Sequence, residues 1–154
     1  MSANVVRRRL EDAAMKQRVM IVEDEFLIAL DVADTVESMG LTVSGFASGR
    51  MHALSLAPNA DIALVDVNLS DGPTGPSIGR ELAERFGVTV IFMTANPEQL
   101  EGHPNGSLGV LTKPVMPHSI EETLDYALAN RLGGIAAVPR DLQIFRHVHH
   151  LQPH

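Results

Sequence analysis

The chain contains no cysteine and no tryptophan, and aromatic residues make up only 4% of its 154 residues. Without cysteine, disulfide bonds, thiolate metal sites and nucleophilic cysteine chemistry are excluded. No uninterrupted apolar run approaches the roughly 20 residues that a membrane-spanning helix needs. The arginine-containing start of the chain is also not followed by the apolar stretch of a signal sequence. We therefore expect a cytoplasmic protein that is not embedded in a membrane.

Positive charge is also scarce, because 12 lysines and arginines stand against 19 aspartates and glutamates, a net charge of −7 with histidines neutral. An acidic chain repels the phosphate backbone of nucleic acids, and the three arginines at positions 7–9 are too small a patch to reverse this. We therefore expect no direct binding to nucleic acid. The length and the hydrophobic content of 45% suit one globular domain.

Apolar segments of strand length alternate with segments of helical periodicity, which is typical of parallel strands joined by crossover helices. The predicted strands are 19–22, 41–44, 62–66, 88–93 and 109–112, and the predicted helices are 26–39, 48–57, 78–86 and 120–132. Ser48 is the expected N-cap of the second of these helices. Segment 96–107 is rich in glycine and proline, so we expect it to be mostly irregular, with a helix no longer than about 97–100. Near the end of the chain, 141–150 has a weakly amphipathic helical pattern.

Polar side chains follow the predicted strands where those strands end. Glu23 and Asp24 follow the first strand, Asp66 ends the third, Thr94 follows the fourth and Lys113 the fifth. In an open parallel sheet, the ligand crevice lies beyond the carboxyl ends of the strands. Three carboxylates that meet there repel one another unless a cation is present, and hard oxygen ligands suit Mg²⁺.

This set of groups favours phosphoryl chemistry. An aspartate can attack phosphorus and form an aspartyl phosphate when a metal ion and a lysine neutralise charge on the transferring group. Asp66, Mg²⁺ and Lys113 would supply these parts. Each residue alone has an ordinary structural explanation as a cap or a surface charge, and only the complete set favours a site.

The five strand-end positions, together with Ala95 and Pro114, resemble the pattern of response-regulator receiver domains over residues 18–132. The resemblance implies a flavodoxin-like α/β fold with a five-stranded parallel sheet of order 2-1-3-4-5. The segments DVNLSDGPTG and VIFMTANPEQL are further similar to alphaproteobacterial receivers, including those of general stress-response regulators.

The resemblance also implies a role for each site residue. Asp66 would be the phosphoacceptor, with Thr94 and Lys113 contacting the phosphoryl oxygens. Mg²⁺ would be held by Asp24 and Asp66, by Glu23 through a water molecule, and by the backbone carbonyl of Asn68. The Lys113-Pro114 peptide bond would be cis, since X-Pro bonds adopt this form at low cost.

The sequence departs from the receiver pattern in three places. Val110 stands three residues before Lys113, where receivers commonly have Tyr or Phe, so switching by an aromatic side chain there is impossible. The broken segment after Thr94 leaves no room for a long fourth helix. The extensions 1–17 and 133–154 lie outside the resemblance, and we interpret the second as a tail without an output domain.

These observations predict a phosphorylation switch and not an enzyme. Its phosphodonor would be a histidine kinase or a phosphotransfer protein, and its output would be altered binding to a downstream protein, onward transfer in a phosphorelay, or removal of phosphate from a kinase. A homodimer is left open. One alternative is a phosphate-independent interaction domain, which Val110 makes conceivable. A Mg²⁺-dependent phosphohydrolase is less favoured, because it normally needs an acid two residues after the nucleophile, where Asn68 stands.

Four histidines near the end of the chain invite a metal-binding interpretation: His147, His149, His150 and His154. No cysteine or carboxylate cluster accompanies them, so we interpret them as part of a solvated tail or a docking segment.

Overall fold

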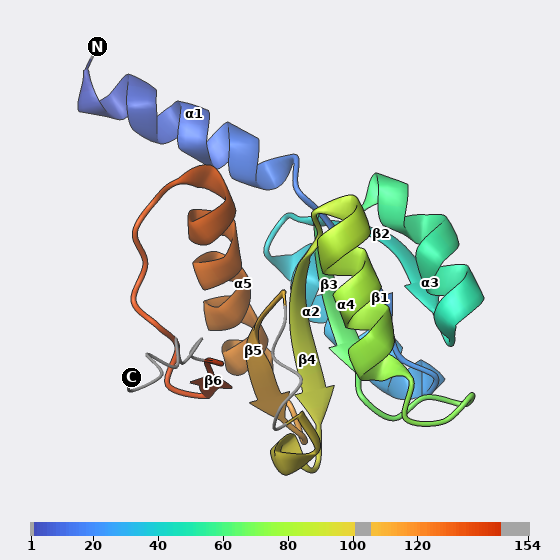
Figure 1. The fold of residues 1–154 in the computed structure, drawn as a ribbon. Coiled ribbons are helices and arrows are strands. Elements are labelled where there is room, and N and C mark those ends of the chain that lie inside the picture. Colours follow the sequence, from blue (N-terminus) through green and yellow to red (C-terminus); the bar gives the residue numbers. More distant parts are fainter. Residues whose placement is uncertain (1, 101–105, 146–154) are drawn as a thin grey trace, which may run out of the picture.

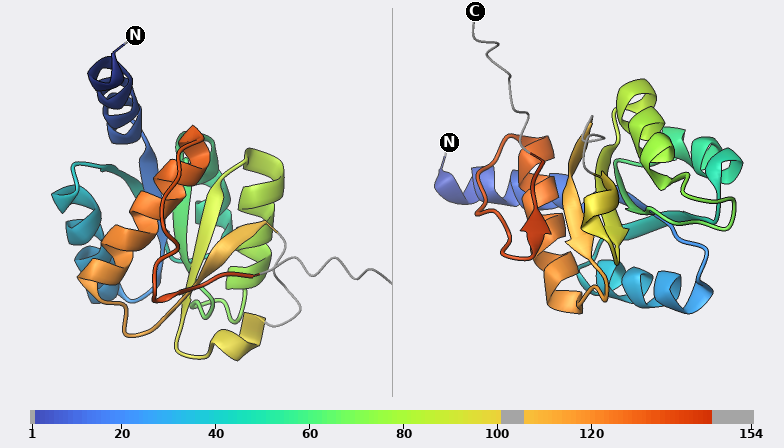
Figure 2. Two further views of the ribbon diagram at one scale, coloured as in Figure 1. Left: turned by 90° about the vertical axis from the view of Figure 1, so that its left-hand side faces the viewer. Right: turned by 60° about the horizontal axis from the view of Figure 1, so that its bottom comes forward.

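The computed structural model describes residues 2–100 and 106–145. Within these residues, the chain forms one sheet in the order β2-β1-β3-β4-β5-β6, with helices on both faces (Figures 1 and 2). The strands are β1 (Arg18–Val22), β2 (Thr42–Ala47), β3 (Ile62–Asp66), β4 (Thr89–Thr94), β5 (Ser107–Thr112) and β6 (Leu142–Gln143). The helices are α1 (Ala3–Met15), α2 (Phe26–Ser38), α3 (Arg50–Leu56), α4 (Gly75–Phe86) and α5 (Pro117–Leu132), with 3₁₀ turns η1 (Ala57–Asn59) and η2 (Pro97–Leu100).

The two faces of the sheet carry separate apolar layers. Side chains from α2 and α5 pack on one face, and those from α3 and α4 pack on the other. β3 is buried along its whole length because both of its faces are covered. This is the arrangement expected for a parallel sheet whose strands read as continuous apolar runs. The α/β class and the strand order 2-1-3-4-5 of the first five strands are therefore confirmed.

Glycines end two of the helices where the sequence predicts. Gly87 follows α4 with φ 67° and Gly133 follows α5 with φ 75°. Both values lie in the left-handed region, which glycine adopts without a steric penalty, so each helix can close its last turn there.

The sheet has six strands rather than five. β6 pairs antiparallel with β5, with Leu142 opposite Leu111 and Gln143 opposite Val110. The predicted helix 141–150 is therefore wrong within the described residues, and the histidines at 147–154 lie outside them. A Cβ on Gly109 would lie 2.6 Å from the carbonyl oxygen of Gln143, so the missing side chain gives the tail room to approach β5.

Several element boundaries also differ from expectation: α4, α5 and β5 begin two or three residues earlier, and β4 is shifted by one residue to end at Thr94. β2 continues to Ala47 instead of ending at Ser44, and its Gly45 packs against the side chain of Leu56. Glycine weakens an isolated strand, but β2 pairs with β1 on both sides of Gly45, so the strand continues beyond this residue. α3 begins after Gly49 with no side-chain cap, so the predicted N-cap role of Ser48 is wrong.

The extension before β1 forms helix α1, which packs against α5 and projects beyond the sheet (Figures 1 and 2). None of its residues is buried. Of the glycine- and proline-rich segment, residues 97–100 form only the short turn η2, as predicted, and 101–105 lie outside the described residues. Among the described helices, none combines the length and apolar character needed to cross a membrane.

Candidate functional site

Three carboxylates meet beyond the carboxyl ends of β1 and β3. Glu23 and Asp24 follow β1 directly, and Asp66 is the last residue of β3, the strand that pairs with β1. One oxygen of each carboxylate lies within 4.8 Å of the others. Glu23 and Asp66 are buried, whereas Asp24 is exposed to solvent. The adjacency of the parallel strands thus brings together acids that are far apart in the sequence.

Lys113 brings a positive charge to this cluster from the end of β5. Its Nζ donates hydrogen bonds to Glu23 Oε2 and to Asp66 Oδ2, each at 3.0 Å. The backbone N–H of Lys113 donates to the carbonyl of Thr94 at 2.9 Å, which joins the ends of β5 and β4. The Lys113-Pro114 bond is cis, as the resemblance implies.

Burial and the neighbouring charges change the ionisation of Glu23 and Lys113. Burial, followed by the hydrogen bond to Asp66, raises the pKa of Glu23 to about 7. Burial alone would lower the pKa of Lys113, but hydrogen bonds to Asp66 and Glu23 outweigh it, and the pKa is raised. Lys113 is therefore charged at neutral pH, and a second cation would stabilise the ionised form of Glu23.

The donor set fits a hard divalent cation. All three convergent ligands are carboxylates, which Mg²⁺ prefers, and they are incompletely neutralised by Lys113. The exposed position of Asp24 leaves the cluster open to solvent, and Mg²⁺ usually keeps several water ligands. Asp24, Asp66 and Glu23 are thus the side chains suited to hold such an ion.

Asn68 and Thr94 lie beside the cluster, and both contact a residue that sequence reasoning missed. The backbone N–H of Asn68 donates to Asp66 Oδ1 at 3.1 Å. The Asn68 Nδ2 and the Thr94 hydroxyl both donate to Gln99 Oε1, at 3.1 and 3.3 Å. Gln99 comes from η2, and its sequence signal was only a polar residue in a segment interpreted as irregular. The metal-ligand role of the Asn68 carbonyl stays a prediction.

The backbone below Asp66 is tightly packed. A Cβ on Gly75, at the start of α4, would lie 2.2 Å from the carbonyl oxygen of Asp66 and 2.6 Å from Cα of Val67. The N–H of Gly75 also donates to the carbonyl of Val67 at 3.1 Å. The absence of a side chain at Gly75 thus lets α4 begin directly against the end of β3, which fixes the position of Asp66.

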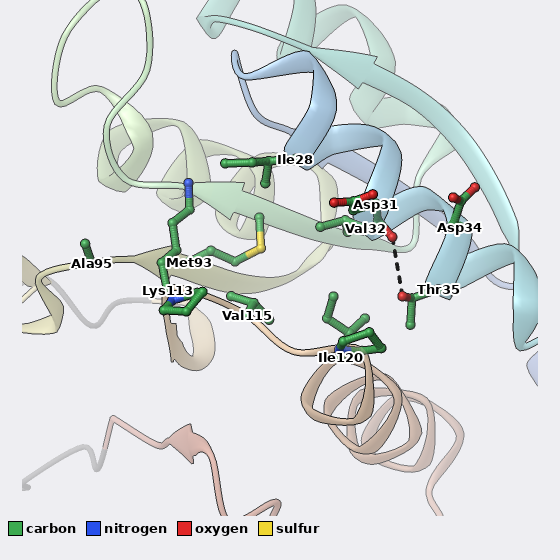
Figure 3. Close-up of a pocket in the computed structure, with 12 residues that line it drawn as sticks. Ile28, Asp31, Val32, Asp34, Thr35, Met93, Ala95, Lys113, Val115 and Ile120 are labelled. Atoms are coloured by element: carbon green, nitrogen blue, oxygen red, sulfur yellow. Dashed lines mark hydrogen bonds between the residues drawn. The ribbon is translucent and has the colours of Figure 1, made fainter.

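A cavity of about 680 Å³ adjoins the site between α2, the ends of β4 and β5, and α5 (Figure 3). Lys113 and Met93 lie on its sheet side, and Ile28 and Val32 line it from α2. In the chain, Ile28 follows Phe26 and Leu27, which begin α2 and are 69% and 76% exposed. The Lys113 amine thus lies between the acidic cluster and a largely apolar surface.

Comparison with known families identifies the domain. The model of the response regulator receiver domain matches residues 19–125. The chain belongs to this family. It is 35% identical over 120 residues to the phyllosphere-induced regulator PhyR of Methylorubrum extorquens, covering 75% of this chain and 45% of that protein. It is 29% identical over 117 residues to the transcriptional regulatory protein PdtaR of Mycobacterium tuberculosis, covering 73% and 56%. The chain thus spans about half the length of these curated relatives.

Solved receiver structures show the same fold. The response regulator PhyR from Brucella abortus superimposes with a TM-score of 0.69 at 30% identity, covering 86% of this chain and 58% of that one. The receiver domain of PhyR from Erythrobacter litoralis gives 0.67 at 29% identity, covering 80% and 97%. The receiver family agrees with the resemblance of the strand-end residues, and the similarity to PhyR-type regulators agrees with that of the segments DVNLSDGPTG and VIFMTANPEQL.

Proposed function

We propose that this receiver is a phosphorylation switch in which Asp66 accepts a phosphoryl group from a histidine kinase or a phosphotransfer protein. The observation that carries the proposal is the Lys113 amine, held 3.0 Å from Asp66 Oδ2 at a cluster of three carboxylates. An Asp66 oxygen would bond to phosphorus as the bond from phosphorus to the donor histidine nitrogen breaks.

The other side chains of the site would neutralise the charge of the phosphoryl group or donate hydrogen bonds to it. Mg²⁺, when bound by Asp24, Asp66 and Glu23, supplies positive charge that offsets the phosphoryl oxygens. Lys113 supplies a second positive charge, 3.0 Å from Asp66 Oδ2. The Thr94 hydroxyl, fully buried at the end of β4, is a hydrogen-bond donor for a phosphoryl oxygen.

The exposed apolar start of α2 suits the docking of the phosphodonor. Phe26 and Leu27 lie two and three residues beyond Asp24, and Met116, 51% exposed, follows the Lys113-Pro114 bond. A partner that covers Phe26, Leu27 and Met116 would hold its phosphohistidine beside the acidic cluster. Apolar side chains that are this exposed around a polar centre are typical of a protein-binding surface.

We propose that the output is altered binding to a protein partner. PhyR from Bartonella quintana, of similar fold at 29% identity and a TM-score of 0.65, is described as an anti-anti-sigma factor. The relay and phosphate-sink roles remain alternatives within the same chemistry. Turnover of small substrates is not proposed, because Asn68 stands where a phosphohydrolase would need an acid.

The experiment is phosphotransfer from an autophosphorylated histidine kinase of the same host, followed by gel and by mass spectrometry. We expect labelling of Asp66 within seconds to minutes in Mg²⁺, and no labelling with excess chelator. Asp66→Asn keeps the shape of the side chain and removes its nucleophilic charge, so it should abolish labelling in a folded protein. Lys113→Ala should still be labelled, but its phosphorylation should change partner binding only weakly.

Asp61→Asn is the matched control, because Asp61 lies at the other end of β3 and binds the backbone and side chain of Arg18 at 2.8 and 3.2 Å. This variant should label like the parent. Labelling that survives in folded Asp66→Asn, or that is insensitive to chelator, would place the chemistry elsewhere.

A further inference from the structure

The Thr94 hydroxyl has only one hydrogen to donate, and in this structure it donates that hydrogen to Gln99 Oε1 at 3.3 Å. The lone-pair side of the same oxygen accepts the N–H of Asn96 at 3.1 Å. The side chain is fully buried, so water offers no alternative partner. A phosphoryl oxygen on Asp66 would therefore compete with Gln99 for a single hydrogen.

Lys113 does not face this conflict. An ammonium has three hydrogens, of which the bonds to Glu23 and Asp66 use two. Lys113 can thus contact a phosphoryl group without leaving its present partners. Thr94 is the residue at which a new contact must replace an existing one.

Gln99 is placed to carry the result of this exchange to another part of the molecule. Its Oε1 also accepts Nδ2 of Asn68 at 3.1 Å, so one oxygen joins the loop after β3 to η2. The next residue, Leu100, is fully buried and packs in the apolar layer under α3 and α4. A shift of the Gln99 side chain would thus affect η2, the turn whose last residue, Leu100, is buried in the core.

We propose that Gln99 is the positioning residue of the switch: it holds the Thr94 hydroxyl in the unphosphorylated protein and releases η2 when Thr94 turns to the phosphoryl group. This inference rests on the proposed function at Asp66. The Thr94 hydroxyl can donate its hydrogen either to Gln99 or to a phosphoryl oxygen, but not to both. These two alternatives give the two-state element that a switch requires. Phosphorylation then changes the surface formed by η2, and that surface is where a partner would distinguish the two states.

The test uses beryllium trifluoride, which mimics a phosphoryl group on a carboxylate, added with Mg²⁺ to ¹⁵N-labelled protein. In the parent we expect saturable binding and large amide shifts at 97–100. Gln99→Met keeps the length of the side chain and removes the acceptor, so Thr94 no longer has a competing partner. We expect about three- to tenfold tighter binding, the value of one net hydrogen bond, and loss of the shifts at 97–100.

Glu98→Gln is the matched control, because Glu98 is an exposed neighbour on η2; it should behave as the parent. Gln99→Glu keeps the acceptor and should retain the shifts. The decisive comparison is a double-mutant cycle: in a Thr94→Ala background, Gln99→Met should change the affinity no further. Independent effects of the two substitutions, or unchanged affinity and shifts in Gln99→Met, would overturn the inference. Failure of the parent itself to bind the mimic, or equal binding by Asp66→Asn, would instead contradict the proposed function.

Discussion

The metal-free protein should become less stable as the pH rises from about 5 to 8, and Glu23 is the cause. Its side chain is removed from solvent, and burial together with Asp66 raises its pKa from 4.5 to about 7. Between these two values the folded state holds a proton that the unfolded state has lost. Linkage then requires the free energy of unfolding to fall as the pH rises through this window.

The magnitude follows from the shift. Each pKa unit corresponds to about 1.4 kcal/mol, so the change from 4.5 to about 7 gives a loss of at most about 3 to 4 kcal/mol. Below pH 4.5 the carboxyl is protonated in both states, and above pH 7 it is ionised in both, so the loss is confined to the interval between them. That loss is a sizeable part of the about 5 to 15 kcal/mol typical of a domain.

Urea unfolding followed by circular dichroism, in chelator and at half-unit steps of pH, measures this effect. Glu23→Gln cannot ionise, so the difference in stability between parent and variant isolates Glu23 from every other titrating group. We expect this difference to change by 2 to about 3 kcal/mol across the window, with the parent falling relative to the variant. Saturating Mg²⁺ at pH 8 should restore the parent. A difference that stays constant from pH 5 to 8 would refute the raised pKa of Glu23.

Three further outcomes follow from the packing and the ligand set. Asp24→Ala and Asp66→Ala should each weaken Mg²⁺ binding, measured by calorimetry. Binding as tight as that of the parent in both variants would contradict the proposed metal site. Gly75→Ala should destabilise the protein by about 1 to 3 kcal/mol and slow labelling, because the added methyl group meets the backbone at Asp66; Ser77→Ala, on the exposed face of α4, is the control. Leu142→Ala should cost about 2 kcal/mol or more in urea unfolding if the tail is docked in solution, and no measurable change would contradict β6.

The core of the fold and the acidic cluster could be predicted because both depend on local patterns and on one general rule. β3 reads as an apolar run that ends in Asp66, and its burial on both faces is what such a run indicates. The rule that parallel strands present their carboxyl ends at one edge then places Asp66 near Glu23 and Lys113 without knowledge of any distance. The two hydrogen bonds of 3.0 Å that Lys113 donates could not be predicted from the sequence, because their lengths depend on the folded structure.

β6 and Gln99 could not be predicted because each depends on tertiary contacts. A two-residue strand has too little pattern to outweigh the weak helical periodicity around it. It forms because Leu142 finds a buried place on β5 and because Asp141 accepts a hydrogen bond from Ser119 at 2.6 Å. Likewise, nothing in the sequence around Gln99 indicates that its amide oxygen meets Asn68, from the loop after β3, and Thr94, at the end of β4.

The same imbalance of charge links the predicted instability of the metal-free site to the proposed response of the site to phosphorylation. Three carboxylates with one ammonium favour the arrival of a cation, and Mg²⁺ would stabilise the ionised form of Glu23, whose pKa is raised by burial and by Asp66. A phosphoryl group on Asp66 would add negative charge again, and Lys113 can meet it with its remaining hydrogen. Thr94 can meet it only by leaving Gln99. Lys113 can thus contact the phosphoryl group while it keeps its present partners, whereas the Thr94 hydroxyl must exchange Gln99 for the phosphoryl oxygen. In the proposed switch, Thr94 is therefore the residue that links phosphorylation to a conformational change.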